Sequence, residues 1–464
     1  MKKTVPLRVQ LSILAVGLLT FLGVLIETSM NVTFPTLTKE LNVSLGTVQW
    51  LTTGYLLLTT IVMSTTAFIL KKFNPRRIFV VAVSLCLIGS LICFSAPSFA
   101  ILMVGRLLQA VATGLATPLM FSLIFEEIPV TRLGLYTGIA GVVISLAPAL
   151  GPTYGGIVNR IWGWREIFIG ILPLIVIILI LGWFTIRGQA RGTDGISFDY
   201  LGVASLAVIF VTILLTFDSA GRHGWTSPQF WLGTLISLAF IAGFSWYTRH
   251  SKRQLIDFSI LRLPVLRLRL FSYFGLQFMN IGLSFLLPIF AQTVLKADSA
   301  QAGLMLLPGS LLGSVVGLIA GQLYDKRGAT LPLMLSGGLI TLGCGLFLVN
   351  AATLTLTSIT WIYILVRVGF NFGFSTTLSD GSVQVQGALK SDQNSLFSMM
   401  QQYAGSLGTN VLSVVISAVA LTTSNPVTST ALGAKIDFVL LTILAVAILI
   451  SIIYVYWRYE RHQA

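Results

Sequence analysis

Fourteen long apolar runs divide this sequence, and they constrain its fold more than any other feature. A helix needs about 20 mostly apolar residues to cross a bilayer. Runs of that length occur at about 11–32, 48–70, 77–97, 101–123, 134–157, 166–186, 200–218, 228–248, 267–294, 302–324, 330–350, 354–378, 396–421 and 436–457. Only 9% of the residues are charged, which excludes an ordinary soluble domain because its surface would need far more charge. We therefore expect an all-α polytopic membrane protein with about 14 transmembrane helices.

The basic residues indicate how the expected helices are oriented. If the N-terminus is cytoplasmic, 21 of the 29 Lys and Arg residues lie in cytoplasmic loops or tails and six lie on the other side. Cytoplasmic loops of membrane proteins carry this excess, so both termini are expected in the cytoplasm. The net charge of +14 is spread over short loops, and it therefore reports topology and predicts no nucleic-acid partner.

The two ends of the chain repeat one pattern. AFILKKFNPRR (67–77) follows the second run, and GQLYDKRG (321–328) follows the tenth. Arg106 is the second residue of GRLLQAVATG in the fourth run, and Arg367 is the second residue of VRVGFNFGFS in the twelfth. Parallel half-repeats place a substrate cavity between the halves and permit rocking between inward and outward states. We expect an N-terminal six-helix bundle at 1–190, an inserted helix pair with a linker at 191–265, and a C-terminal six-helix bundle at 266–464.

The fifth run, GIAGVVISLAPALGPTYGG at 138–156, combines small residues with two prolines. Small residues spaced by four lie on one helical face and let a neighbouring helix approach closely. The prolines remove backbone hydrogen bonds, so the helix can bend there. Two interpretations stay open, a static packing contact and a seam that also flexes.

Ionisable residues inside the runs are the candidates for proton coupling. Of the 15 acids, Glu27 lies well within a run, whereas Asp218 and Asp380 lie at run ends. An ionised acid near the bilayer centre costs about 2.5–3.5 kcal/mol, so it faces a cavity, pairs or takes up a proton. Glu27 is therefore interpreted as the proton carrier, or as a glutamate that a permanent hydrogen bond neutralises.

Four other charges are weighed in the same way. Arg106 either influences a nearby acid as the cavity changes or ties helices together through backbone carbonyls, and Arg367 has the same two interpretations. Asp218 marks the outer mouth of the inserted pair or takes part in coupling. Asp380 is a cytoplasmic end charge or a second coupling candidate.

Several motifs together give the chain a family resemblance. They are IETSMNVTFP at 26–35, QWLTTGYLL from Gln49, the Arg106 motif, WREIF from Trp164, FDYLG from Phe198 and AGLMLLP from Ala302. In this order they resemble the fourteen-span drug:proton antiporter branch of the major facilitator superfamily, which includes quaternary-ammonium and lincomycin exporters. Glu27 stands where this branch usually has aspartate. The resemblance implies the major facilitator fold, two six-helix bundles plus two inserted helices.

The resemblance also implies roles for two sets of residues. The conformational motifs match at Gly138, Gly151, Pro152, Gly155, Gly156, Gly321, Asp325 and Gly328, although Ala147 stands where the fifth-span motif usually has glycine. Aromatic faces attract lipophilic cations, and a substrate cavity is expected among the polar and aromatic residues Asn31, Trp50, Tyr55, Gln109, Gln277, Asn280, Arg367, Asn371, Gln401 and Tyr403. Each of these side chains is also a candidate for ordinary packing.

The first-half loop motif departs from the family pattern. Ala67 replaces its first glycine, Lys71 replaces its aspartate and Asn74 replaces a later glycine, whereas the second-half copy keeps Gly321 and Asp325. In this family the loop is thought to latch the cytoplasmic side of the outward-facing state through the aspartate. Lys71 is instead expected to bind lipid headgroups or an acid such as Glu126 or Glu127.

These patterns favour a proton-coupled multidrug efflux antiporter that exports lipophilic, often cationic, drugs or antibiotics by alternating access. A dedicated exporter of an endogenous lipid or metabolite is the alternative. No phosphate-cradling loop, metal-ligand cluster or nucleophile–base pair occurs, so we expect neither an enzyme nor a cofactor nor a metal site. The expected partners are drugs, protons and membrane lipids, and the expected setting is a monomer in a bacterial cytoplasmic membrane.

Overall fold

The chain is all-α over the residues that its computed structural model describes, 5–33, 36–37, 40–43, 45–187, 198–251, 256–297, 299–387, 389–423 and 425–460. Within these described residues, thirteen stretches of helix are long and apolar enough to cross a membrane. Helix α3 (Leu45–Lys72, 28 residues) covers the expected run at 48–70 as a further long helix. The polytopic all-α fold expected from the apolar runs is confirmed.

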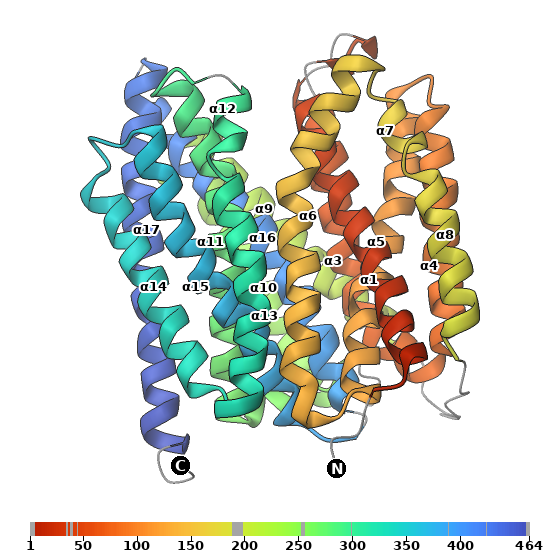
Figure 1. The fold of residues 1–464 in the computed structure, drawn as a ribbon. Coiled ribbons are helices and arrows are strands. Elements are labelled where there is room, and N and C mark those ends of the chain that lie inside the picture. The colour runs from red at the N-terminus through yellow and green to blue at the C-terminus, as the bar shows by residue number, and fades with distance from the viewer. Residues whose placement is uncertain are drawn as a thin grey trace. The chain divides into compact units, whose positions relative to one another are not determined.

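The first part of the chain forms the elements α1 (Leu7–Ser29), η1 (Met30–Thr33), α3 (Leu45–Lys72), α4 (Pro75–Phe94), α5 (Phe99–Glu127), η2 (Val130–Arg132), α6 (Leu133–Ile161), α7 (Glu166–Ile169) and α8 (Leu172–Thr185). The remainder forms α9 (Tyr200–His223), α10 (Pro228–His250), η3 (Phe258–Arg262), α11 (Pro264–Thr293), α12 (Ser299–Leu304), α13 (Leu307–Arg327), α14 (Thr330–Val349), α15 (Leu356–Val383), α16 (Leu389–Ala420), α17 (Pro426–Val455) and η4 (Tyr456–Glu460). Figure 1 labels most of these elements.

The chain divides into two compact units. Unit 1 comprises Met1–Ser197 together with Gln386–Met399, and unit 2 comprises Phe198–Val385 together with Met400–Ala464. The division falls inside α16, whose first turns pack with α3 and α5 of unit 1. The three-part division at 190 and 265 stays a prediction, and its first boundary lies in 188–197, outside the described residues.

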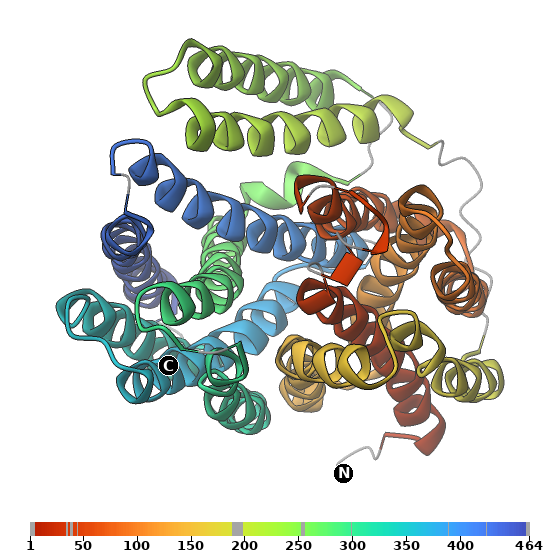
Figure 2. The same ribbon diagram turned by 90° about the horizontal axis from the view of Figure 1, so that it is seen from above.

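Within unit 1, α1 packs against α5, α6 and α8, and α4 packs against α5. Within unit 2, α15 packs against α11, α13 and α14, while α17 packs against α11 and α14. The inserted helices α9 and α10 run side by side as a pair, and Figure 2 shows both of them lengthwise.

Local sequence sets where the helices begin. Asn74 accepts a hydrogen bond from the backbone of Arg76 and precedes Pro75, so α4 begins with a side-chain cap and a proline in its first turn. Asn425 and Pro426 begin α17 in the same way. These caps satisfy backbone donors that the first helical turn leaves open.

Two expected runs are each built from two helices. The run at 166–186 consists of α7 and α8, and the run at 302–324 consists largely of α12 and α13. A proline lies in the first turn of α8 (Pro173) and of α13 (Pro308). Proline lacks the N–H that would continue the preceding helix, so the chain restarts there. In contrast, α6 is one helix from Leu133 to Ile161 although it contains Pro148 and Pro152.

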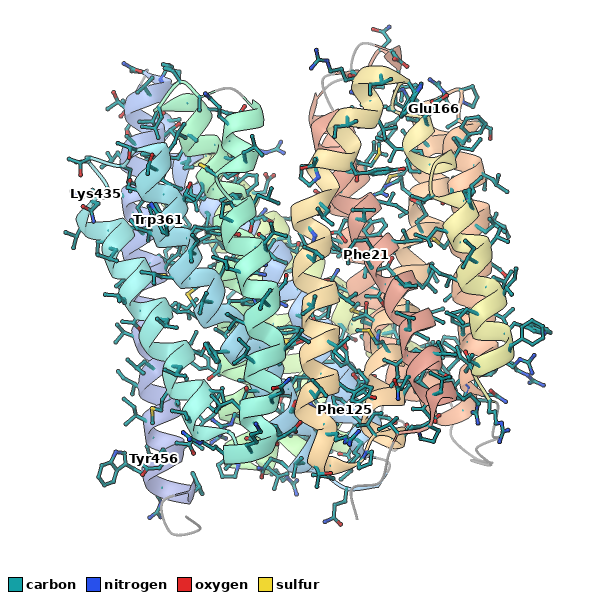
Figure 3. The ribbon with its side chains drawn as sticks, in the orientation of Figure 1. Phe21, Phe125, Glu166, Trp361, Lys435 and Tyr456 are labelled. Atoms are coloured by element: carbon teal, nitrogen blue, oxygen red, sulfur yellow. The ribbon has the colours of Figure 1, made fainter. Side chains whose placement is uncertain are left out.

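Large apolar side chains cover the outside of the helices. Trp361 of α15, labelled in Figure 3, is 66% exposed. A membrane supplies apolar surroundings for such side chains, whereas water would leave them unfavourably solvated. The exposed surface therefore agrees with a chain that lies in lipid.

Candidate transport site

Glu27 lies near the end of α1, close to the buried guanidinium of Arg106 on α5. The Glu27 side chain is partly buried, and its Oε2 has no hydrogen-bond partner. Arg106 is fully buried and interacts electrostatically with Glu27, while its Nε and Nη2 also have no hydrogen-bond partner. The two described side chains do not form a salt bridge. Both the Glu27 carboxylate and the Arg106 guanidinium thus keep buried polar atoms that form no hydrogen bond.

Neutral groups hold Arg106 in this position. Its Cζ lies 4.4 Å from the centre of the Tyr55 ring on α3. Its Nη1 donates to Gln109 Oε1 at 3.0 Å, and Gln109 Nε2 donates to Ser90 Oγ of α4 at 2.9 Å. Because these partners carry no negative charge, Glu27 supplies the opposite charge that Arg106 senses.

Tyr55 connects three helices at this site. Its hydroxyl lies 3.1 Å from the backbone oxygen of Gly23 in α1 and 2.6 Å from Thr113 Oγ1 in α5. The Gly23 position has no room for a side chain, because an added Cβ would overlap Thr113 Oγ1. The sequence-predicted residues Glu27, Tyr55, Arg106 and Gln109 therefore meet in one polar cluster inside unit 1.

The small residues of α6 pack directly against the end of α1 that carries Glu27. A Cβ added at Gly151 would overlap Thr28 Oγ1, and one added at Gly155 would overlap the backbone oxygen of Ser29. Ser29 Oγ also lies 2.9 Å from the Gly151 oxygen. The close helix contact predicted from small residues is thus present next to Glu27.

The other fifth-span motif residues are placed differently. Gly138 is buried in α6, and Pro152 lies inside the same helix. A Cβ added at Gly156 would meet nothing within 4 Å, so that glycine is not needed for packing in this structure. Close approach to α1 therefore depends on Gly151 and Gly155.

A second polar cluster lies in unit 2 around Arg367 of α15. The Arg367 guanidinium donates from Nη1 to Asn280 Oδ1 of α11 and lies 5.2 Å from the Phe370 ring centre. Asn280 contacts Gln277, and Asn371 Nδ2 donates to the Arg367 backbone oxygen at 2.9 Å. Arg367 thus contacts the Asn280 amide on α11, the first long helix of the second half. In the first half, Arg106 instead interacts with the Glu27 carboxylate on α1.

The remaining predicted cavity residues lie outside these two clusters. Gln401 Oε1 accepts a hydrogen bond from the Tyr273 hydroxyl at 2.7 Å, and the Tyr403 ring lies 4.3 Å from Phe210 between centres. Trp50 is 49% exposed near the start of α3. Asn31 belongs to η1, but its side chain lies outside what the structure describes.

The two reserve candidates for proton coupling are both in ion pairs. Asp218 Oδ2 lies 2.9 Å from Arg222 Nε on the same helix, and both side chains are exposed. Asp380 Oδ2 lies 2.7 Å from Arg269 Nε, and this pair is largely buried. Neither acid joins the Glu27 cluster.

The second-half loop motif lies at the end of α13. Gly321 is buried within α13, Asp325 is partly buried near the end of that helix, and Gly328 ends it with a φ of 74°. Glycine suits that left-handed conformation, which other residues rarely adopt. The backbone conformation at the end of α13 thus explains why glycine occupies position 328.

Lys71 has a partner that the sequence did not predict. Its Nζ lies 2.5 Å from Asp392 Oδ2 in the first turn of α16, and the two side chains are 20% and 1% exposed. Glu126, one of the suggested partners, instead accepts a hydrogen bond from Ser122 Oγ at 2.8 Å. The acid that the structure pairs with Lys71 is thus Asp392, which α16 brings from far along the chain, and pairing with Glu126 or Glu127 stays a prediction.

Two further hydrogen bonds join the start of α16 to α3 and α5 within unit 1. Thr66 Oγ1 and Ser395 Oγ lie 2.8 Å apart, and Asn394 Nδ2 donates to the Pro118 oxygen at 2.7 Å. Together with the Lys71–Asp392 pair they form a polar clasp, by which we mean Thr66, Lys71 and Pro118 with Asp392, Asn394 and Ser395.

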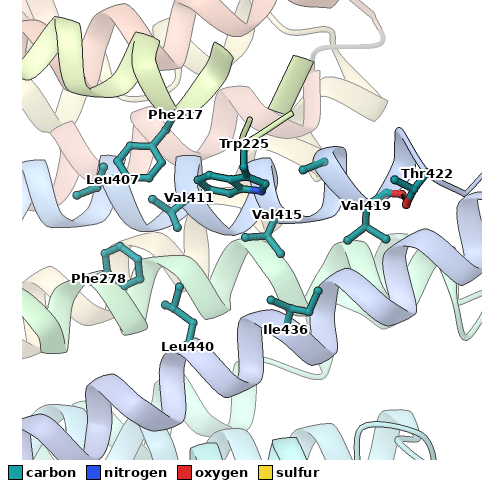
Figure 4. Close-up of a pocket in the computed structure, with 11 residues that line it drawn as sticks. Phe217, Trp225, Phe278, Leu407, Val411, Val415, Val419, Thr422, Ile436 and Leu440 are labelled. Atoms are coloured by element: carbon teal, nitrogen blue, oxygen red, sulfur yellow. Dashed lines mark hydrogen bonds between the residues drawn. The ribbon is translucent and has the colours of Figure 1, made fainter. Parts of the chain in front are cut away.

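An apolar pocket of about 740 Å³ lies inside unit 2. Figure 4 shows Phe217 and Trp225 on one side of α16 and Phe278, Ile436 and Leu440 on the other. Thr422 supplies a hydroxyl, and the other lining residues are Leu407, Val411, Val415, Ala418 and Val419. Sequence analysis missed this pocket, because an apolar helix face that lines a cavity has the same pattern as one that is packed.

Comparison with known proteins shows the family to which this chain belongs. The sequence profile of the Major Facilitator Superfamily matches residues 16–409. The chain is 32% identical over 411 residues to the uncharacterized MFS-type transporter YhcA of Bacillus subtilis, covering 87% of this chain and 76% of that protein. It is 31% identical over 419 residues to the lincomycin resistance protein LmrB of Listeria innocua, covering 90% and 88%.

Solved structures share the fold. The human organic anion transporter MFSD10 matches with a TM-score of 0.65 at 16% identity, covering 96% of this chain and 99% of that one. The proton:xylose symporter XylE matches with a TM-score of 0.65 at 14% identity, covering 96% and 95%. The profile match and these relatives show that the chain belongs to the Major Facilitator Superfamily, whose members are membrane transporters rather than enzymes.

Proposed function

We propose that this transporter is a proton-coupled antiporter that exports lipophilic, often cationic, drugs or antibiotics. The observation that carries the proposal is the partly buried Glu27 carboxylate beside Arg106, with bonding capacity left on both side chains. The names of the relatives agree, because they include lincomycin resistance and multidrug resistance proteins.

Glu27 provides a simple coupling scheme. In the outward-facing state its carboxylate takes up a proton and the drug leaves. In the inward-facing state the proton is lost to the cytoplasm and a drug binds again, so drug and proton compete for one carboxylate. Each pH unit of gradient supplies about 1.4 kcal/mol per proton, and each 100 mV supplies about 2.3 kcal/mol per charge moved.

The α1–α6 contact gives this scheme a mechanical connection. Gly151 and Gly155 of α6 abut Thr28 and Ser29, which directly follow Glu27. A change of charge at Glu27 therefore occurs where α1 and α6 are in closest contact. Alternating access in transporters built from repeats is largely a rocking of one bundle against the other, and we propose that this seam passes the change of charge at Glu27 on to the rest of its own bundle.

The proposed setting is a bacterial cytoplasmic membrane, with both termini in the cytoplasm. The excess of basic residues in alternate loops supports this orientation. The proposed partners are the drug, protons and surrounding lipids, and the proposed functional form is a monomer.

The test uses the purified full chain in proteoliposomes with ethidium and an imposed pH gradient. Wild-type vesicles are expected to exchange ethidium for protons, whereas Glu27→Gln vesicles lose proton-driven uptake. Glu127→Gln is the matched control, since that acid is exposed at the end of α5. Normal exchange by Glu27→Gln would reject Glu27 as the carrier.

Export of an endogenous lipid is the second candidate function. The apolar pocket of about 740 Å³ favours it, because a single hydroxyl among otherwise apolar residues suits an acyl chain. Absence of ethidium transport by the wild type, combined with movement of a fluorescent phospholipid, would favour this candidate.

A further inference from the structure

Asp437 is a buried acid that none of the preceding roles uses. It is the second residue of the apolar run 436–457, and because α17 begins at Pro426 it lies well inside the helix. Its side chain is fully buried. Neither Oδ1 nor Oδ2 has a hydrogen-bond partner in the described part of the chain.

The residues beside Asp437 on α17 pack against apolar groups. One turn earlier, Gly433 abuts Ile416 of α16, where an added Cβ would lie 2.8 Å from the Ile416 Cα. The next residue, Phe438, stacks on Phe347 of α14 with ring centres 5.2 Å apart. The neighbours of Asp437 on α17 for which contacts are known, Gly433 and Phe438, thus pack against hydrocarbon.

The charged groups of the neighbouring helices are engaged elsewhere. On α11, Arg269 pairs with Asp380, and Arg267 lies in the same first turns of the helix. On α16, Asp392 pairs with Lys71, and Lys390 is the second residue of the helix. The titratable group of α14 is the buried thiol of Cys344.

The contacts between α11 and α17 place the charged end of α11 far along α17 from Asp437. Ser272 Oγ lies 3.0 Å from Ser451 Oγ, and an added Cβ at Gly275 would lie 2.6 Å from Ile448 Cδ1. Tyr273, between them, bonds Gln401. Arg267 and Arg269 are therefore at a different level of the helix pair.

The charged groups nearest in sequence or across the pocket are at the surface. Lys435 on α17 is exposed. On α9, Asp218 and Arg222 pair with each other in exposed positions, and His223 is exposed as well. No cation among the described side chains compensates Asp437.

An ionised carboxylate in such surroundings is very unfavourable, so the neutral, protonated form is the stable one here. A protonated carboxyl still leaves a buried hydroxyl donor and oxygen acceptors unsatisfied, which an apolar side chain of similar size would avoid. Asp437 is therefore expected to destabilise the packing of α17, and packing alone gives no reason for an acid at this position.

A cavity reaches this stretch of α17. Ile436 and Leu440, on either side of Asp437 in sequence, both line the apolar pocket of Figure 4. Water that enters this pocket when α17 moves relative to α16 would reach the helix next to Asp437. The carboxyl then gives its proton to that water, leaving carboxylate and hydronium, and in the other state the carboxylate takes a proton from hydronium, leaving water.

We propose that Asp437 is a second proton-binding carboxyl of this transporter, located in unit 2 and separate from Glu27. The proposal rests on the proposed proton-coupled function, and it adds a proton to each transport cycle. No reactant other than water and the proton is needed.

The first experiment detects the proton itself by infrared spectroscopy of the purified full chain in lipid. The wild type is expected to show a protonated-carboxyl band that Asp437→Asn lacks and that changes when tetraphenylphosphonium is added. Glu27→Gln removes a different band, and Glu127→Gln serves as the control. A wild-type spectrum in which the Asp437 band never responds to pH or tetraphenylphosphonium would overturn the proposal.

The second experiment counts protons moved per ethidium in proteoliposomes. Asp437→Asn keeps the shape of the side chain, and we expect it to transport ethidium while moving about half as many protons as the wild type, since one of two carriers is lost. Asp437→Leu is expected to raise the melting temperature and give the same reduced ratio. An unchanged ratio in both variants would show a purely structural acid.

The two proposals fail in different ways. If the wild type moves no protons with ethidium, the antiport proposal fails, and the infrared response to pH still decides whether Asp437 binds an exchangeable proton. If the wild type and Asp437→Asn both couple fully while Glu27→Gln does not, antiport through Glu27 stands and the Asp437 proposal fails.

Discussion

Lys71 Nζ at the end of α3 lies 2.5 Å from Asp392 Oδ2 in the first turn of α16. The pair reverses the charges expected from the family's loop motif, since the loop supplies the cation and α16 supplies the acid. Asp392 is almost completely buried, whereas Lys71 keeps one-fifth of its side chain exposed. Removing Lys71 therefore leaves a charge that water does not reach, whereas removing Asp392 leaves a charge that is partly solvated.

This inequality gives a prediction for single substitutions. Lys71→Met removes the cation that the structure pairs with the buried Asp392 carboxylate, and breaking such a pair costs about 3–5 kcal/mol. Asp392→Asn is expected to cost less, because the Lys71 ammonium still reaches solvent. Thermal unfolding of both variants in detergent measures the difference, with Lys72→Met on the exposed neighbour as control.

Exchanging the two charges provides the stronger check. Lys71→Asp combined with Asp392→Lys restores an ion pair in the reverse order, so the double variant is expected to be more stable than either single charge change. A double variant no better than the worse single one would mean that the contact is not electrostatic.

The α1–α6 seam predicts a sharp contrast between adjacent glycines. Gly155→Ala forces a Cβ into the Ser29 backbone, whereas Gly156→Ala meets nothing within 4 Å. We expect Gly155→Ala and Gly151→Ala to destabilise the protein by about 1–3 kcal/mol, as overpacking does. Gly156→Ala is expected to be neutral or slightly stabilising, because alanine favours the helix.

The chain carries its own reporter for this measurement. Cys86, Cys93 and Cys344 are free and buried, so a thiol-reactive dye labels them only when the helices open. The melting temperature from dye labelling is expected to fall for Gly151→Ala and Gly155→Ala. Equal melting temperatures for all three glycine variants would contradict a close-packed seam.

We expect substitution of Arg106 to reduce proton coupling and substitution of Arg367 to reduce stability. Arg106→Gln removes the charge that Glu27 senses, and we expect a tenfold or greater drop in protons moved per ethidium. Arg367→Gln removes a contact to the neutral Asn280 amide, so it should lower stability and keep the proton ratio. Parallel proteoliposome assays compare the ratios, and the reverse pattern would move coupling to unit 2.

Asp218 predicts a small effect. It pairs with Arg222 one turn away while both side chains remain exposed. Exposed pairs contribute little, so Asp218→Asn is expected to change the unfolding free energy by less than about 0.5 kcal/mol. Ethidium exchange is expected to stay within twofold of the wild type, and a large loss of proton coupling would instead place Asp218 on the proton path.

The number and order of the long helices could be predicted from the sequence alone. In a membrane each helix must satisfy its own backbone hydrogen bonds, and its apolar side chains can face lipid directly. Helix formation is therefore encoded locally, run by run, and caps such as Asn74 and Asn425 set helix starts in the same local way. Glu27 could also be recognised, because one acid inside an apolar run is visible without a fold.

Only the tertiary structure decided which residues meet. Lys71 and Asp392 are 321 residues apart, and no local pattern joins them. Gly151, Gly155 and Gly156 look alike in sequence, yet α1 abuts the first two and leaves the third open. Asp437 stands at the edge of an apolar run in the sequence, yet α17 begins eleven residues before it and buries it completely. The physical reason is common to all three. Side-chain contacts and burial depend on how helices pack over long chain separations, while the helices themselves depend on neighbours within a turn or two.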